Sequence, residues 1–211
     1  MVVNSVLALM PHDLLWGLTS SALPEDAPDW ARQALDLDQP VVVRRESSAP
    51  GRVAVGVRGP AREQRYATSM AVAHIRRRVS PEQLVGASID PAHWPALRAL
   101  QQVKPAMTAL GLIWGVAGSA GYELASGVAA LHQGSDLDLI VRTPESVDRA
   151  WAAELVSSLE TAACRIDIQL QLPAGAIALR EWARPAGQVL LKTSQGARLV
   201  RDPWQPQEAC A

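Results

Sequence analysis

The chain has 211 residues, of which 48% are hydrophobic and 19% charged, a composition typical of a globular protein with one sizeable domain or two small ones. Its formal net charge of −1 gives no global basic field, so we expect no nucleic-acid partner. No apolar run approaches the length that crosses a bilayer, so we expect no membrane partner. Cys164 and Cys210 match neither a metal-ligand spacing nor a disulfide framework, which favours a reducing, cytoplasmic location.

The first part of the chain, residues 1–91, is predicted to form a small α/β domain. A short helix near residues 29–37 precedes two β-like runs at residues 40–45 and 52–58. Turn-forming Ser, Pro and Gly residues lie between the two runs and predict a hairpin. Residues 64–78 form a further strand or helix, because their Ala and Met content leaves the type open.

Arginine is concentrated in this first part. The densest candidate site consists of Arg58, Arg62 and Arg65, which flank the break at Gly59 and Pro60. Planar guanidinium groups bind phosphate oxygens in pairs, so these three residues are predicted to bind substrate. An ordinary solvated basic surface explains the pattern equally well.

The second part, residues 92–211, is predicted to be a mixed sheet with flanking helices, which makes the protein α+β. The elements expected in chain order are a helix at 95–110, a strand at 112–117, a helix from 119, a strand at 136–141, a helix at 144–162, a strand at 166–172, a helix at 175–182 and a hairpin over 188–200.

Three places in this second part are predicted to contact an anionic substrate. The strand that ends at residue 117 runs into Gly118 and Ser119, and a helix start of this kind offers backbone N–H groups to phosphate, although a plain helix cap is the alternative. Ser135 either donates a hydrogen bond to phosphate or shapes the turn before the next strand. Lys192 lies in an apolar strand, where we expect a buried partner or a phosphate to compensate its charge.

The most informative feature is a pair of carboxylates, Asp136 and Asp138, inside an apolar alternation. Residues two apart on a strand point to the same side of the sheet, so the two charges repel unless a cation compensates them. The pair therefore predicts a divalent metal site, with Mg²⁺ as the expected ion. Asp167 lies on the polar face of a later strand and either completes the metal shell, accepts a proton, or simply faces solvent.

A Gly-Ser turn, an Asp-x-Asp pair and a third Asp on a later strand resemble, in that order, the nucleotidyltransferase superfamily that includes DNA polymerase β. The resemblance implies a polymerase-β-like sheet for the second part. Further segments resemble the malonate decarboxylase-specific holo-acyl-carrier-protein synthases, also called phosphoribosyl-dephospho-CoA transferases. These segments are residues 11–16, 57–65, 118–127, 135–139, 178–182, 191–193 and 202–204.

The second resemblance implies a reaction and its partners. Members of this family transfer a prosthetic group from triphosphoribosyl-dephospho-CoA to a serine of the malonate decarboxylase acyl-carrier subunit, and pyrophosphate leaves. It also implies that Asp136 and Asp138 are the catalytic aspartates. Carrier subunits are typically acidic, so the arginine-rich first part is expected to dock the carrier or the substrate.

Two other interpretations of the sequence stay open. A nucleotidyltransferase that passes AMP to a small molecule or a protein would use the same three carboxylates. A noncatalytic binding module could keep the fold without the reaction, although the presence of both paired aspartates and the Gly-Ser turn argues against it.

Overall fold

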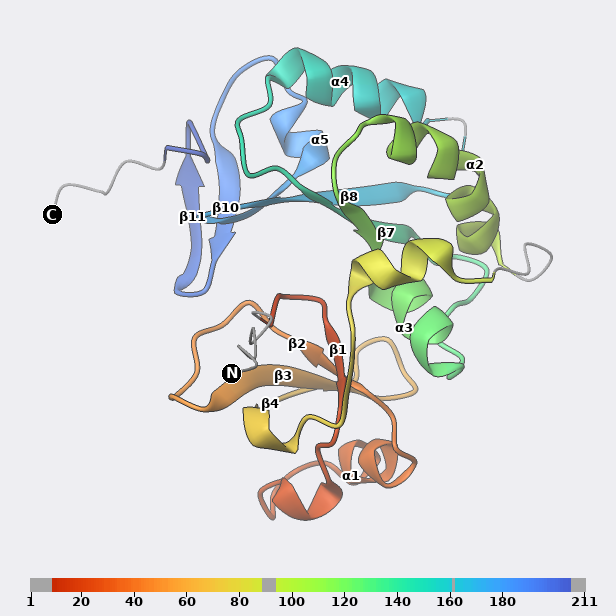
Figure 1. The fold of residues 1–211 in the computed structure, drawn as a ribbon, viewed down its shortest axis with the longest axis vertical. Coiled ribbons are helices and arrows are strands. Elements are labelled where there is room, and N and C mark those ends of the chain that lie inside the picture. Colours follow the sequence, from red (N-terminus) through yellow and green to blue (C-terminus); the bar gives the residue numbers. More distant parts are fainter. Residues whose placement is uncertain (1–8, 89–93, 161, 206–211) are drawn as a thin grey trace, which may run out of the picture. The chain divides into compact units, whose positions relative to one another are not determined.

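The computed structural model describes residues 9–88, 94–160 and 162–205. The chain divides into two compact units, Met1–Ser80 and Pro81–Ala211, each built around its own sheet (Figure 1). Within the described residues, no helix combines the length and the hydropathy that a membrane span requires.

The first unit holds an antiparallel five-stranded sheet in the order β4-β3-β2-β1-β5. In chain order the strands are β1 (Leu14–Trp16), β2 (Val41–Val43), β3 (Arg52–Arg58), β4 (Arg65–Ala71) and β5 (Arg77–Val79). The segment whose type the composition left open therefore contains two strands, β4 and β5, joined by a short 3₁₀ turn, Val72–His74.

One helix, α1 (Asp29–Asp36), packs on this sheet. Its buried residues Ala31 and Leu35 join a core that includes Val55 and Val57 of β3. Because successive strand residues point to opposite faces, Arg58 follows the buried Val57 on the face away from α1. That face therefore carries Arg58 and its register partner Arg65.

The second unit holds a six-stranded mixed sheet in the order β11-β10-β9-β8-β7-β6. The strands are β6 (Trp114–Val116), β7 (Leu137–Arg142), β8 (Ile166–Leu172), β9 (Gly175–Ala178), β10 (Val189–Thr193) and β11 (Gly196–Val200). Only the β7–β8 pair is parallel, and a parallel pair needs a crossover connection. Helix α4 (Arg149–Ser158) supplies that connection.

Apolar side chains on one face of β7 and β8 form the centre of this unit's core. On β7 these are Leu137, Leu139 and Val141, and on β8 they are Ile166, Ile168, Leu170 and Leu172. The remaining helices are η3 (Pro81–Gly86, 3₁₀), α2 (Pro95–Ala109), α3 (Gly118–Ser126) and α5 (Leu179–Trp182). Figure 1 shows α4 and α5 on one side of the sheet and α3 on the other. The mixed α+β character and the alternation of β8 confirm the sequence prediction.

Two predicted helices differ from the observed elements. The helix expected at 175–182 is wrong in its first half, because β9 forms there through a tight turn and pairs antiparallel with β8. Only α5 is helical. The helix expected from 144 begins at Arg149, where the side chain of Asp148 accepts a hydrogen bond from the Trp151 amide at 2.6 Å and caps the first turn.

Candidate active site

The close approach of α3 to β7 places one carboxylate of the predicted pair. Gly118, the first residue of α3, has a φ of +58°, a conformation that favours glycine. A Cβ at this position would overlap Asp138 Oδ2 and would lie 2.6 Å from Asp138 Cγ. The Ala117 amide also donates to the Asp138 carbonyl at 2.9 Å. The carboxylate of Asp138 therefore lies against the N-terminus of α3, where the helix dipole favours negative charge.

The three predicted aspartates lie at the beginning of the parallel pair of strands. Asp138 and Asp167 are register partners on β7 and β8, so their side chains project from the same face of the sheet. Asp136 directly precedes β7 and lies two residues before Asp138. All three side chains are half-buried. The register therefore places the three predicted aspartates near the same end of the two strands.

The third carboxylate has a partner of its own. Arg165 donates to Asp167 Oδ1 from Nε at 3.0 Å and forms an ion pair with the same oxygen at 3.0 Å. Within the described residues, no group of three or more His, Cys, Asp or Glu side chains converges closely enough to hold a metal ion. Two carboxylates, Asp136 and Asp138, are a ligand set compatible with Mg²⁺, because this ion is commonly held by one or two carboxylates and completes its shell with water and phosphate; its binding here stays a prediction.

Ser135 shapes the turn into β7. Its side chain is 7% exposed, and Oγ accepts a hydrogen bond from the His132 amide at 3.0 Å. The Ser135 amide in turn donates to the His132 carbonyl at 3.0 Å. This geometry agrees with the turn-shaping role, and donation of the hydroxyl proton to a phosphate stays a prediction.

Cys164 lies within electrostatic range of the carboxylate pair, and the sequence prediction did not include it in the site. Burial raises the pKa of the Cys164 thiol, the Leu137 amide opposes this rise by hydrogen bonding, and the negative charges of Asp136 and Asp138 raise the pKa further. The sequence signal was its position at the start of the strand that carries Asp167, because parallel strands in register bring their beginnings together.

The predicted arginines of the first unit meet at one end of the β3–β4 hairpin. Arg58 and Arg65 are directly opposite each other, and Arg62 is exposed in the connecting turn. Arg65 also donates to the Gln64 carbonyl at 2.8 Å. Three arginines therefore lie at this end of the hairpin, and their contact with an anionic substrate stays a prediction.

A buried partner for Lys192 is not required, and its contact with a phosphate stays a prediction. The side chain is exposed, because β10 and β11 form the edge hairpin of the sheet. In the register, Lys192 lies opposite Ala176, Ala176 opposite Gln171, and Gln171 beside Arg142. Arg142 is at the far end of β7 from Asp138, about 13 Å along the strand at about 3.3 Å per residue. The structure therefore does not bring Lys192 to the carboxylates.

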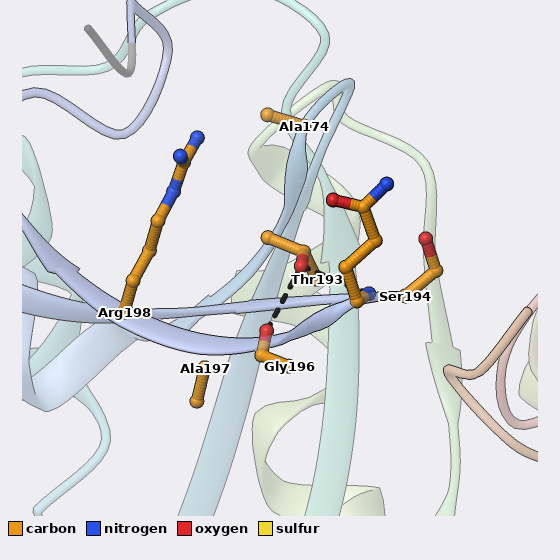
Figure 2. A pocket seen from close by; sticks show the side chains of 7 residues that line it. Ala174, Thr193, Ser194, Gly196, Ala197 and Arg198 are labelled. Atoms are coloured by element: carbon orange, nitrogen blue, oxygen red, sulfur yellow. Dashed lines mark hydrogen bonds between the residues drawn. The ribbon is translucent and has the colours of Figure 1, made fainter. Parts of the chain in front are cut away.

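A separate pocket lies at the tip of this edge hairpin. Its lining comes from Ala174 and from the residues at 193–198, and Figure 2 shows Arg198 extending beside it. Thr193 Oγ1 donates to the Gly196 carbonyl at 2.9 Å and closes the turn. None of the predicted site residues lines this pocket.

Family models match both units of the chain. The model described as the phosphoribosyl-dephospho-CoA transferase MdcG C-terminal domain matches residues 83–203, and the corresponding N-terminal domain model matches residues 10–81. The chain belongs to the phosphoribosyl-dephospho-CoA transferase MdcG family. The family predicted from the sequence is confirmed, and with it the prediction that the protein is a transferase.

Curated relatives of the MdcG family match the chain along its whole length. A phosphoribosyl-dephospho-CoA transferase of Pseudomonas syringae pv. tomato is 60% identical over 211 residues, which is 100% of both chains. One from Pseudomonas fluorescens is 59% identical and covers 96% of this chain and 97% of its own. One from Pseudomonas aeruginosa is 52% identical and covers 92% and 93%, respectively. No solved structure matches the chain.

The position of Cys164 gives a direct test of the site geometry. We expect Asp136→Asn and Asp138→Asn each to accelerate alkylation of Cys164 by iodoacetamide near neutral pH. Removing a nearby negative charge lowers the pKa of the thiol and increases the thiolate fraction. The rate is measured by mass spectrometry in a Cys210→Ser background. Glu154→Gln, on the exposed side of α4, should leave the rate unchanged, whereas unchanged rates in both Asp variants would contradict the described arrangement.

Proposed function

We propose that this chain transfers the phosphoribosyl-dephospho-CoA group from triphosphoribosyl-dephospho-CoA to a serine of the apo acyl-carrier subunit of malonate decarboxylase, with release of pyrophosphate. Family membership over both units supports the group that is transferred. The observation that carries the chemistry is the half-buried pair Asp136 and Asp138, held against the start of α3. The free thiol of Cys164 fits a reaction in the reducing cytoplasm.

The chemistry is attack of a serine hydroxyl on the α-phosphorus of the triphosphate chain. Negative charge accumulates on the phosphoryl oxygens and on departing pyrophosphate, so positioning and electrostatics supply most of the acceleration. Asp136 and Asp138 would hold Mg²⁺, which supplies positive charge to offset that accumulation. Gly118 and Ser119 would position the triphosphate, and Asp167 would accept the proton of the serine.

Helix α3 offers a second contact to the triphosphate. The residue before it, Ala117, has no polar side chain and makes no side-chain cap hydrogen bond. The backbone N–H groups of a helix start favour a phosphate ligand. We assign the β- and γ-phosphates to the region of Gly118 and Ser119, beside the carboxylate of Asp138.

We assign to Asp167 the role of the base that accepts the proton of the acceptor serine. Both contacts of Arg165 are made to Oδ1 of this carboxylate, so Oδ2 is the oxygen that would accept the proton of the attacking hydroxyl. The position of Asp167 beside Asp138 on the neighbouring strand supports this role. The same arrangement, with a Gly-Ser helix start and carboxylates on β7 and β8, supports a polymerase-β-like nucleotidyltransferase fold for the second unit.

The carboxylate pair is tested by mass spectrometry of the carrier. The unaltered chain, incubated with triphosphoribosyl-dephospho-CoA, Mg²⁺ and apo carrier, should add the prosthetic group to one serine. Asp136→Asn and Asp138→Asn should each slow transfer by about 100-fold or more, by analogy with the loss of a charge-stabilising group in other active sites. Wild-type rates in either variant would contradict the proposal. A carrier that gains only the mass of AMP from ATP would instead identify a general nucleotidyltransferase.

The paired arginines of the β3–β4 hairpin are the surface to which we assign the carrier. Arg58 and Arg65 are register partners on β3 and β4, and exposed Arg62 lies in the turn between these strands, so positive charge gathers there and would complement an acidic carrier. Such a contact contributes mainly to encounter and weakens with salt, because exposed charges are screened over about 8 Å at physiological ionic strength.

We expect the double variant Arg58→Gln/Arg65→Gln to raise the KM for carrier several-fold, to leave kcat unchanged and to flatten the salt dependence of the KM. The matched control is Arg98→Gln, which removes an exposed arginine from α2. Steady-state transfer kinetics between low and high salt measure both quantities. An unchanged KM and salt dependence in the double variant would exclude this surface.

A further inference from the structure

A side chain of α3 that the proposed mechanism does not use holds the loop that leads to Asp136. Glu123 Oε2 accepts hydrogen bonds from the amides of Ala130 and Leu131, at 2.7 and 2.8 Å. Glu123 is half-buried, and Leu131 is 6% exposed. Two hydrogen bonds to one oxygen fix the loop backbone at the point where its buried apolar anchor begins.

The chain between this clamp and the aspartate is itself ordered by a turn. His132 and Ser135 exchange two hydrogen bonds, from the His132 amide to Ser135 Oγ and from the Ser135 amide to the His132 carbonyl, both at 3.0 Å. Asp136 follows directly. The clamp and the turn therefore form a continuous set of contacts from α3 to the first carboxylate of the pair.

Helix α3 thus acts on both members of the pair. Its first residue, Gly118, lies against the Asp138 carboxylate, and its Glu123 holds the loop that delivers Asp136. Figure 1 shows α3 beside β7, as this arrangement requires. Because the separation of two metal-binding carboxylates must be kept to a fraction of an ångström, a rigid element that contacts both is an effective support.

We propose that Glu123 is a positioning residue, which sets Asp136 beside Asp138 through the backbone of the loop at residues 130–135. This inference rests on the proposed function, since it assigns Glu123 to the transferase site. Glu123 acts by its reach and its acceptor oxygen, and its negative charge is not what the site requires.

Two conservative variants separate the effect of side-chain length from the effect of charge. Glu123→Gln keeps the length of the side chain and an oxygen that accepts both N–H groups, but removes the charge. Glu123→Asp keeps the charge but is one methylene shorter and falls short of Ala130 and Leu131. Glu154→Gln and Glu154→Asp, at an exposed position of α4, are the matched controls.

The first readout is amide hydrogen exchange at residues 130 and 131, which needs no activity. We expect Glu123→Asp to speed exchange there by about tenfold or more, while Glu123→Gln and both controls stay near the unaltered chain. The second readout is the Mg²⁺ concentration for half-maximal transfer. It should rise by about tenfold in Glu123→Asp alone, the usual effect of losing an outer-shell support, with the KM for carrier unchanged.

The opposite order, with Glu123→Gln impaired and Glu123→Asp normal, would show that the charge matters and would overturn the proposal. Unchanged exchange in Glu123→Asp would exclude the clamp itself. If the unaltered chain transfers nothing to the carrier, the proposed function fails, and the exchange measurement still decides whether Glu123 holds the loop.

Discussion

The Asp138 carboxylate occupies the space into which a side chain at Gly118 would project, and the rest of the site depends on this close approach. It brings the N-terminus of α3 against the beginning of β7, so a negative side chain and a helix start share one location. The helix dipole stabilises the carboxylate. Only a residue without a Cβ allows both the left-handed backbone at position 118 and the short separation from β7.

The same contact explains how two carboxylates can be kept close together in a folded chain. Holding Asp136 and Asp138 half-buried and two residues apart costs free energy through mutual repulsion and partial desolvation. The structure offsets part of this cost with backbone contacts, through α3 at Asp138 and through the tied loop before Asp136. The proposed cation and polyphosphate would add further compensation at the same place.

Much of this arrangement was predictable because it depends on local patterns. Strict alternation over residues 166–172 predicted β8 and its buried face, and the spacing of Asp136 and Asp138 predicted a shared side. Residues 175–178 were assigned to a helix because Gly, Ala and Ile fit either element, and only pairing with β8 decides between them. Lys192 was expected to be buried because an apolar run does not reveal that its hairpin is at the edge of the sheet.

Contacts between distant residues were beyond reach of the sequence. The bonds from Glu123 to the loop follow from how α3 packs against β7, which no spacing in the chain encodes. The fold family likewise needs a three-dimensional comparison.

The most direct test of the central claim compares Gly118→Ala with Gly127→Ala, at the two ends of α3. Both glycines have positive φ, at +58° and +71°, so both variants carry similar backbone strain, of about 1 kcal/mol. A Cβ at Gly127 meets nothing within 4 Å, whereas one at Gly118 displaces the Asp138 carboxylate. Both variants should fold, and transfer to the carrier should fall by about 100-fold or more only in Gly118→Ala. Equal transfer rates in the two variants would contradict the account.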